Sequence, residues 1–77
     1  MYEVYIAPEA HRNSDSLPPR IRGRVTEAIH SLAQDPRPPG SRRLQRVGGY
    51  RLRVGDYRIL YTVDDELRRV TVLRVRL

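Results

Sequence analysis

Arg51, Arg53 and Arg58 are the residues whose type and spacing are best suited to chemistry on a phosphate group. A guanidinium group is planar and permanently charged, and it can donate two parallel hydrogen bonds to phosphate oxygens. Arg51 and Arg53 are two positions apart, and Gly55-Asp56 separates them from Arg58. Because side chains along a β-strand point alternately to the two faces of its sheet, we expect Arg51 and Arg53 to share a face. The spacing predicts that the three cations meet on one surface if the strand register places them together.

The other residues of this segment predict the hairpin that would hold these arginines. Gly55-Asp56 lies between two β-prone runs, and such a pair suits a two-residue turn of the primed type, in which glycine adopts positive φ without strain. Apolar and aromatic residues alternate with the arginines and predict a buried face: Tyr50, Leu52 and Val54 in the first strand, and Tyr57, Ile59, Tyr61 and Val63 in the second. The segment therefore predicts a β-hairpin with one core face and one cationic face.

The chain before the hairpin predicts a strand and two helices. Residues 2–6 alternate as in a strand, and residues 9–17 predict a short helix weakened by poor helix formers. Pro18-Pro19 opens a second helix, which ends at Asp35-Pro36. Its apolar residues recur at helical spacing and predict a core stripe: Ile21, Val25, Ala28, Ile29 and Leu32. Its opposite side predicts a solvated face, with contact to RNA or protein as the alternative: Arg20, Arg22, Arg24 and Glu27.

Further arginines flank the hairpin on both sides. Arg42, Arg43 and Arg46 form a basic approach to it, and Leu44 among them is expected to be buried. Residues 69–77 predict a last strand in which Thr71, Leu73, Val75 and Leu77 face the helices. Arg74 and Arg76 then point to the other face and extend the cationic surface. These five arginines are therefore the candidate RNA-binding residues around Arg51, Arg53 and Arg58.

The hairpin resembles the RelE family of bacterial toxin components, part of the RelE/ParE superfamily, in its run Y-R-L-R-V-G-D-Y-R-I-L-Y from Tyr50 to Tyr61. Weaker matches follow the family's order: Pro8-Glu9-Ala10, residues 32–40, and Val72-Leu73-Arg74-Val75. The resemblance implies one α+β domain over residues 1–77, in the order β-α-α-β-β-β. It also implies a largely antiparallel sheet of about four strands, with an N-terminal helical hairpin packed on one face.

The resemblance implies a toxin that cuts messenger RNA on the ribosome, by attack of a ribose 2′-hydroxyl on the adjacent phosphate. Arg51 and Arg53 match the family's first pair of basic active-site residues, and Arg58 matches the arginine of the next strand. The implied partners are the ribosome, messenger RNA and an acidic antitoxin bound in a hetero-oligomer. The family commonly continues with an arginine and a tyrosine where this chain stops at Leu77. A degenerate antitoxin- or RNA-binding domain and a ParE-like gyrase inhibitor therefore stay as alternatives.

Composition agrees with a nucleic-acid partner and predicts no cofactor. The formal net charge is +6, and all fifteen basic residues are arginines. A basic surface attracts nucleic acid by releasing the counterions of the phosphates. There is no cysteine, and His11 and His30 form no ligand motif in the sequence, so we expect no metal site. No signal peptide or apolar membrane-spanning run is apparent, which predicts a cytoplasmic protein.

Overall fold

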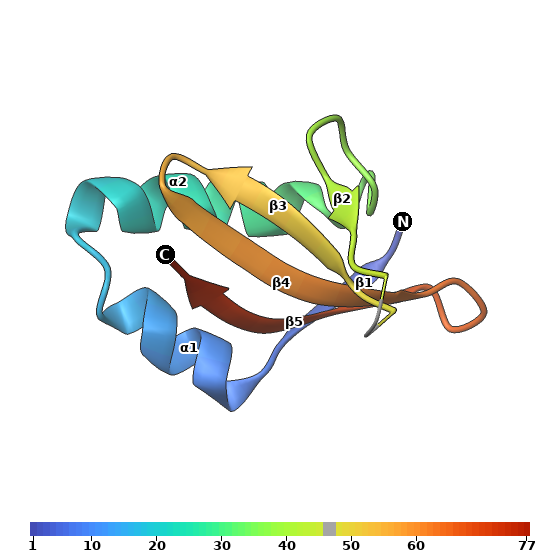
Figure 1. Ribbon diagram of the computed structural model, residues 1–77. Coiled ribbons are helices and arrows are strands. Elements are labelled where there is room, and N and C mark those ends of the chain that lie inside the picture. The colour runs from blue at the N-terminus through green and yellow to red at the C-terminus, as the bar shows by residue number, and fades with distance from the viewer. Residues whose placement is uncertain (46–47) are drawn as a thin grey trace.

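The computed structural model describes residues 1–45 and 48–77, which form two helices and a five-stranded sheet (Figure 1). The elements follow one another as β1 (Glu3–Ile6), α1 (Pro8–Asp15), α2 (Pro19–Ser31), β2 (Arg42–Arg43), β3 (Tyr50–Val54), β4 (Tyr57–Asp64) and β5 (Arg69–Arg76). The α+β class and the predicted order of elements are confirmed. The two-residue strand β2 is an addition that the sequence did not predict, and it raises the number of strands from about four to five.

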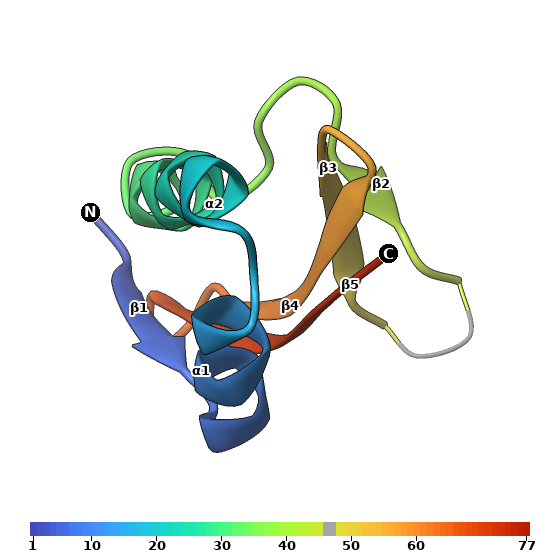
Figure 2. The same ribbon diagram turned by 90° about the vertical axis from the view of Figure 1, so that its left-hand side faces the viewer.

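The sheet has the strand order β1-β5-β4-β3-β2. β1 runs parallel to β5, and every other neighbouring pair is antiparallel. Figure 2 shows α1 and α2 on the same side of the β3–β4 hairpin, as the sequence predicted for the two helices. We call the sheet face that carries Arg51, Arg53 and Arg58 the outer face, because the helices pack against the opposite one.

The core lies between the helices and the sheet. Ala10 and Leu17, the two apolar residues of the first helical region, are both buried. The apolar stripe of α2 supplies three more buried side chains: Val25, Ile29 and Leu32. The sheet contributes Leu52, Val54, Ile59, Tyr61, Val70, Val72 and Val75. The alternation predicted for β3 and β4 is therefore confirmed, and its consequence is that the arginines of these strands remain outside the core.

The β3–β4 turn sets the register of the hairpin. Gly55 has a φ of +61°, whereas Asp56 is not among the residues with positive φ. Positive φ at the first central position alone is what a type II′ turn requires, and glycine adopts it without steric cost. The twist of such a turn matches that of the flanking strands, so it fixes which residues of β3 and β4 are opposite each other.

The face assignment predicted for β5 is wrong over its first half. A register shift falls between Leu60 and Tyr61 of β4, which pair with Arg74 and Val72 of β5, and it leaves Leu73 as the extra residue. A β-bulge of this kind inserts one residue on one strand and reverses the alternation beyond it. Val70 and Val72 therefore enter the core, while Leu73 is 40% exposed. Val75, Arg74 and Arg76 keep the faces that were predicted for them, because they follow the bulge.

α1 is short, and hydrogen bonds of two side chains, Asn13 and Arg22, hold its C-terminal half. The Asn13 side-chain oxygen accepts a hydrogen bond of 2.9 Å from the backbone N–H of Val75, which lies beyond the last β1–β5 pair at Val72. Arg22 of α2 donates to three backbone carbonyls at the end of α1, those of Ser14, Asp15 and Leu17. The solvated face predicted for α2 is thus wrong at Arg22, because this side chain caps the neighbouring helix.

Candidate nucleic-acid interface

Three arginines form a straight row across the outer face, close to the β3–β4 turn. Arg53 of β3 is directly opposite Arg58 of β4, and Arg58 is directly opposite Arg76 of β5. Opposite residues in an antiparallel pair project from the same face, with neighbouring strands about 4.8 Å apart. All three side chains are exposed. The structure therefore brings together Arg53, Arg58 and Arg76 on one face, as the sequence predicted.

A second row lies one step further from the turn. Arg42, Arg51, Leu60 and Arg74 follow one another across β2, β3, β4 and β5. Arg51 and Arg74 are half-buried, and Arg42 is exposed. The short strand β2 is the element that brings Arg42 to this row. Counting the described residues, the outer face therefore carries six arginines in two adjacent rows.

Two of the predicted RNA-binding residues stand apart from these rows. Arg43 is opposite Tyr50, whose side chain packs against the core, so Arg43 projects from the side of the sheet opposite to Arg51. Arg46 lies outside the described residues. The sequence could not place Arg43, because a two-residue strand shows no alternation pattern.

Most arginines of the two rows form no ion pair with an acidic side chain of the described residues. In the described part of the chain, ion pairs join three arginines to carboxylates: Arg37 to Asp65, Arg69 to Glu3, and Arg74 to Glu9 at 3.5 Å. Only Arg74 belongs to the rows. Arg58 donates a 2.6 Å hydrogen bond from Nη2 to a main-chain oxygen of Leu77. Positive charges that no acidic side chain of the described residues neutralises make their face complementary to a polyanion.

A shallow hollow of about 260 Å³ lies on the outer face beside the second row. Its lining includes Leu44, Leu60 and Leu73, and Arg74 borders it. The predicted burial of Leu44 in the core is wrong, because this residue is half-buried and lies in the hollow. The bulge contributes Leu73 to the same place. The cationic face thus has an apolar depression within it.

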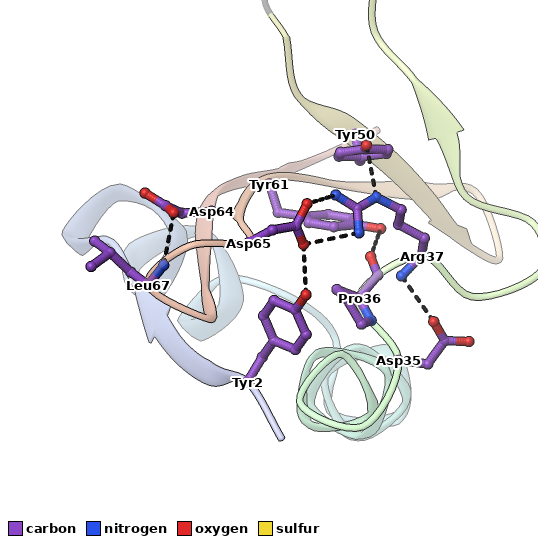
Figure 3. A network of polar contacts seen from close by, with 9 residues as sticks. All are labelled: Tyr2, Asp35, Pro36, Arg37, Tyr50, Tyr61, Asp64, Asp65 and Leu67. Atoms are coloured by element: carbon purple, nitrogen blue, oxygen red, sulfur yellow. Dashed lines mark hydrogen bonds and ion pairs between the residues drawn. The ribbon is translucent and has the colours of Figure 1, made fainter.

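A polar network holds the far end of the hairpin, where β3 begins (Figure 3). Arg37 makes two hydrogen bonds to the Asp65 carboxylate, 2.8 and 3.2 Å long, and its Nε donates to the Tyr50 hydroxyl at 2.8 Å. The Tyr2 hydroxyl donates to Asp65 at 2.6 Å. The network ties the α2–β2 connection to β3, to the β4–β5 turn and to the N-terminus. Sequence reasoning assigned no role to Arg37 and missed these contacts.

The network shifts the pKa values of its members. The hydrogen bonds from Arg37 and then from Tyr2 lower the pKa of Asp65, and the bond to Asp65 raises the pKa of Tyr2. Asp65 and then Tyr50 raise the pKa of Arg37 above its usual range. Burial raises the pKa of Tyr61, whose ring stacks on Tyr50 and whose hydroxyl donates to the Pro36 carbonyl. These shifts all favour the protonation states that the hydrogen bonds need, so the network stabilises the fold.

The two histidines, which are distant in sequence, line one hollow of about 170 Å³ between the helices. In the described part of the chain, no three His, Cys, Asp or Glu side chains are grouped so that they could hold a metal ion. Among those residues, no helix is long and apolar enough to cross a membrane.

Comparison with known proteins identifies the family. The sequence model of the ParE toxin of the type II toxin-antitoxin system parDE matches residues 4–77. Toxin RelG of Mycobacterium tuberculosis is 40% identical over 76 residues, which cover 96% of this chain and 87% of RelG. The chain belongs to the RelE/ParE superfamily of type II toxin-antitoxin toxins.

Solved structures of RelE-type toxins have the same fold. The toxin-antitoxin complex RelBE2 of M. tuberculosis contains a chain with 37% identity and a TM-score of 0.86, over 97% of this chain and 95% of that one. The archaeal RelE-RelB complex of Pyrococcus horikoshii gives 28% identity and a TM-score of 0.87, over 97% and 92%. A chain of the intact Escherichia coli RelBE complex, at 20% identity and a TM-score of 0.83 over 99% and 95%, shares the fold. The RelE-like fold predicted from the hairpin is therefore confirmed.

Proposed function

We propose that this toxin is a ribosome-dependent endoribonuclease that cuts messenger RNA and so inhibits translation. The observation that carries the proposal is the row Arg53, Arg58 and Arg76, three exposed arginines that form no ion pair with an Asp or Glu side chain of the described residues and lie side by side on the helix-free face. The 40% identity to Toxin RelG supports a RelE-type activity. The site of action would be the cytoplasm, where ribosomes and messenger RNA are found.

The chemistry assigned to the arginines is positioning and stabilisation of charge. When the ribose 2′-hydroxyl attacks the adjacent phosphate, negative charge builds up on the phosphate oxygens before the 5′-oxygen leaves. Guanidinium groups placed around those oxygens stabilise that charge more in the transition state than in the ground state. Arg58, in the middle of the row, is the residue we assign to this role, with Arg51 and Arg53 beside it on β3. Arginine stays protonated at working pH, so we assign proton transfer to none of the three.

The partner that controls this activity would be an acidic antitoxin. The matched M. tuberculosis and P. horikoshii toxins were solved as toxin-antitoxin complexes, which supports a hetero-oligomer here. An acidic segment that folds on the outer face would neutralise the arginines and exclude RNA. Binding of the cognate antitoxin should raise the melting temperature and block cleavage.

A second candidate function is inhibition of DNA gyrase, because the matching family model is that of the ParE toxin. Such a toxin would act through protein contacts and would leave messenger RNA intact. DNA double-strand breaks and an SOS response on expression would indicate gyrase inhibition. Arrest of translation without DNA damage would exclude it.

Primer extension on a defined messenger bound to translating ribosomes tests the endoribonuclease. Wild-type protein should cut in the decoding site, and the same messenger without ribosomes should stay intact. Arg58→Ala should lower cleavage by about 100-fold or more, the usual cost of losing one group that stabilises transition-state charge. Arg12→Ala, which removes an exposed charge from α1, should cleave at the wild-type rate. Absence of cleavage by the wild type, with ribosome or antitoxin binding retained, would identify a degenerate binding domain instead.

A further inference from the structure

A notch of about 330 Å³ lies on the side of the molecule, between α2 and the tip of the β3–β4 hairpin. Arg24 of α2 and Arg53 of β3 both line it, together with Glu27, Ser31 and Gly55. Arg24 Nη1 is 3.6 Å from the position that a β-carbon on Gly55 would occupy, so the guanidinium lies against the turn. Two elements that are distant in sequence thus place an arginine each in one small concavity.

The charges in the notch are not neutralised within the described part of the chain. Arg24 and Arg53 form no ion pair with those residues, although Glu27 follows Arg24 by one helical turn. Two arginines and one carboxylate line the notch, so its charge is positive on balance, and a bound anion would reduce the repulsion between the two guanidinium groups. Arginine is particularly suited to phosphate, because its planar donors match two phosphate oxygens at once.

The notch is continuous with the first arginine row, since Arg53 belongs to both. Arg76, Arg58 and Arg53 lead across β5, β4 and β3 toward the hairpin edge, and Arg24 follows beyond that edge. Among residues 1–45 and 48–77, β2 pairs with Tyr50 and Arg51 alone, so no described strand covers β3 near the notch. A chain of phosphates that follows the row is therefore directed toward α2.

We propose that the notch between Arg24 and Arg53 binds a backbone phosphate of single-stranded RNA, so that the RNA path turns from the outer face onto α2. This inference rests on the RNA-binding part of the proposed function. It assigns to Arg24 a role in binding that is separate from cleavage. The negative charge of Glu27 repels the same phosphate and so limits the affinity of the notch for RNA.

The salt dependence of RNA binding measures this contact directly. Each phosphate neutralised on a single strand contributes about 0.7 to the slope of the logarithm of the binding constant against the logarithm of salt concentration. We would follow binding of a fluorescent single-stranded RNA by anisotropy over a series of salt concentrations. Arg24→Gln should bind more weakly and reduce the slope by about 0.7. Arg12→Gln, which removes the same charge from an exposed position of α1 outside the notch, should leave the slope unchanged.

A variant that is expected to bind RNA more tightly provides an independent check. Glu27→Gln removes the carboxylate from the notch and should tighten RNA binding severalfold. Glu66→Gln, in the exposed β4–β5 turn, makes the same change of net charge and should leave binding unchanged. Circular dichroism melting of each variant shows that it is folded.

The outcomes separate this inference from the proposed function. If the wild type cuts messenger RNA on ribosomes while Arg24→Gln and Arg12→Gln bind RNA alike, the notch proposal is wrong and the endoribonuclease stands. If Arg24→Gln loses affinity for a poly-glutamate peptide but keeps the wild-type RNA slope, the notch is a protein contact and the proposal is also wrong. If Arg24→Gln reduces the salt slope and the wild type does not cut messenger RNA, the notch proposal is supported and the proposed nuclease activity is overturned.

Discussion

Arg53 of β3 and Arg58 of β4 are directly opposite each other, one residue from each end of the type II′ turn, and both project onto the outer face. Like charges at directly opposite positions of a sheet destabilise it. Arg76 repeats the arrangement on the other side of Arg58. The row therefore lowers the stability of the free toxin, and any bound polyanion would restore it through preferential binding to the folded state.

Replacing Arg53 by glutamine should stabilise the free toxin while it weakens RNA cleavage. Removal of one cation from the pair should raise the free energy of unfolding by about 0.2–1 kcal/mol at low salt. High salt screens exposed charges, so the gain should shrink there. Urea unfolding at both salt concentrations measures it, and Arg53→Lys, which keeps the charge, should show no gain. A stability loss for Arg53→Gln at both salt concentrations would contradict the repulsion.

The faces of the hairpin could be predicted because its turn and its period-2 alternation agree. In β3 and β4 the apolar residues other than Leu60 occupy one parity, and Gly55 fixes the register between the strands. β5 has apolar residues at both parities, Val70 and Val72 on one and Leu73 and Val75 on the other. Alternation alone therefore allowed either parity of β5 to face the core. In the pairing with β4, one parity faces the core before the bulge and the other parity faces it after the bulge. A bulge depends on the partner strand, which the local sequence does not contain.

The bulge predicts a large difference between two adjacent residues of β5. Val72 is fully buried, so Val72→Ala should lower the free energy of unfolding by about 2 kcal/mol through lost contacts and a residual cavity. Leu73→Ala removes more atoms but from a side chain that is 40% exposed, and it should cost less than about 1 kcal/mol. Chemical denaturation of the two variants compares them. An equal loss of stability for the two variants, or a larger loss for Leu73→Ala, would contradict the bulge and support the uninterrupted alternation predicted from the sequence.

The candidate site could be predicted in part. Arg51, Arg53 and Arg58 lie on the face expected for them, because they follow the alternation that the hairpin sequence displays. Arg74 and Arg76 also lie on the expected face, because they follow the bulge of β5. The contacts of Arg22, Arg24 and Asn13 depend on how the helices approach the sheet. Asn13 and Val75 are 62 residues apart, and nothing in their local sequences relates them. Such contacts arise from tertiary packing and have no local signature.

Asn13 should stabilise the edge of β5 through its side-chain oxygen. Asn13→Ala leaves the Val75 N–H without this partner in a partly buried place, which should lower the free energy of unfolding by about 1–3 kcal/mol. Asn13→Asp keeps an acceptor at the same position and should retain most of the stability. Urea unfolding and hydrogen exchange of the Val75 amide measure the effect. Arg12→Ala, on the exposed side of α1, is the control; an equal loss there would assign the effect to the helix rather than to the edge.

The Arg37–Asp65 pair should make the stability of the protein depend on acid pH. Hydrogen bonds from Arg37 and Tyr2 hold the pKa of Asp65 below its ordinary value, so the unfolded chain takes up a proton at this carboxylate before the folded protein does. The contribution of Asp65 is therefore fully present above a pH of about 4 and is lost as the pH falls through the folded pKa. The melting temperature of the wild type should fall over this range.

Asp65→Asn isolates that contribution from those of the other carboxylates. The amide cannot take up the proton, so the variant should melt lower than the wild type near neutral pH and should lose less on acidification, and the two curves should converge. Glu66→Gln changes the net charge equally at the neighbouring position and should follow the wild-type curve. Parallel curves for the wild type and Asp65→Asn would mean that the network of Tyr2, Arg37 and Asp65 adds nothing to stability through the charge of Asp65. Convergence would show that this pair stabilises the end of the hairpin opposite the arginine row.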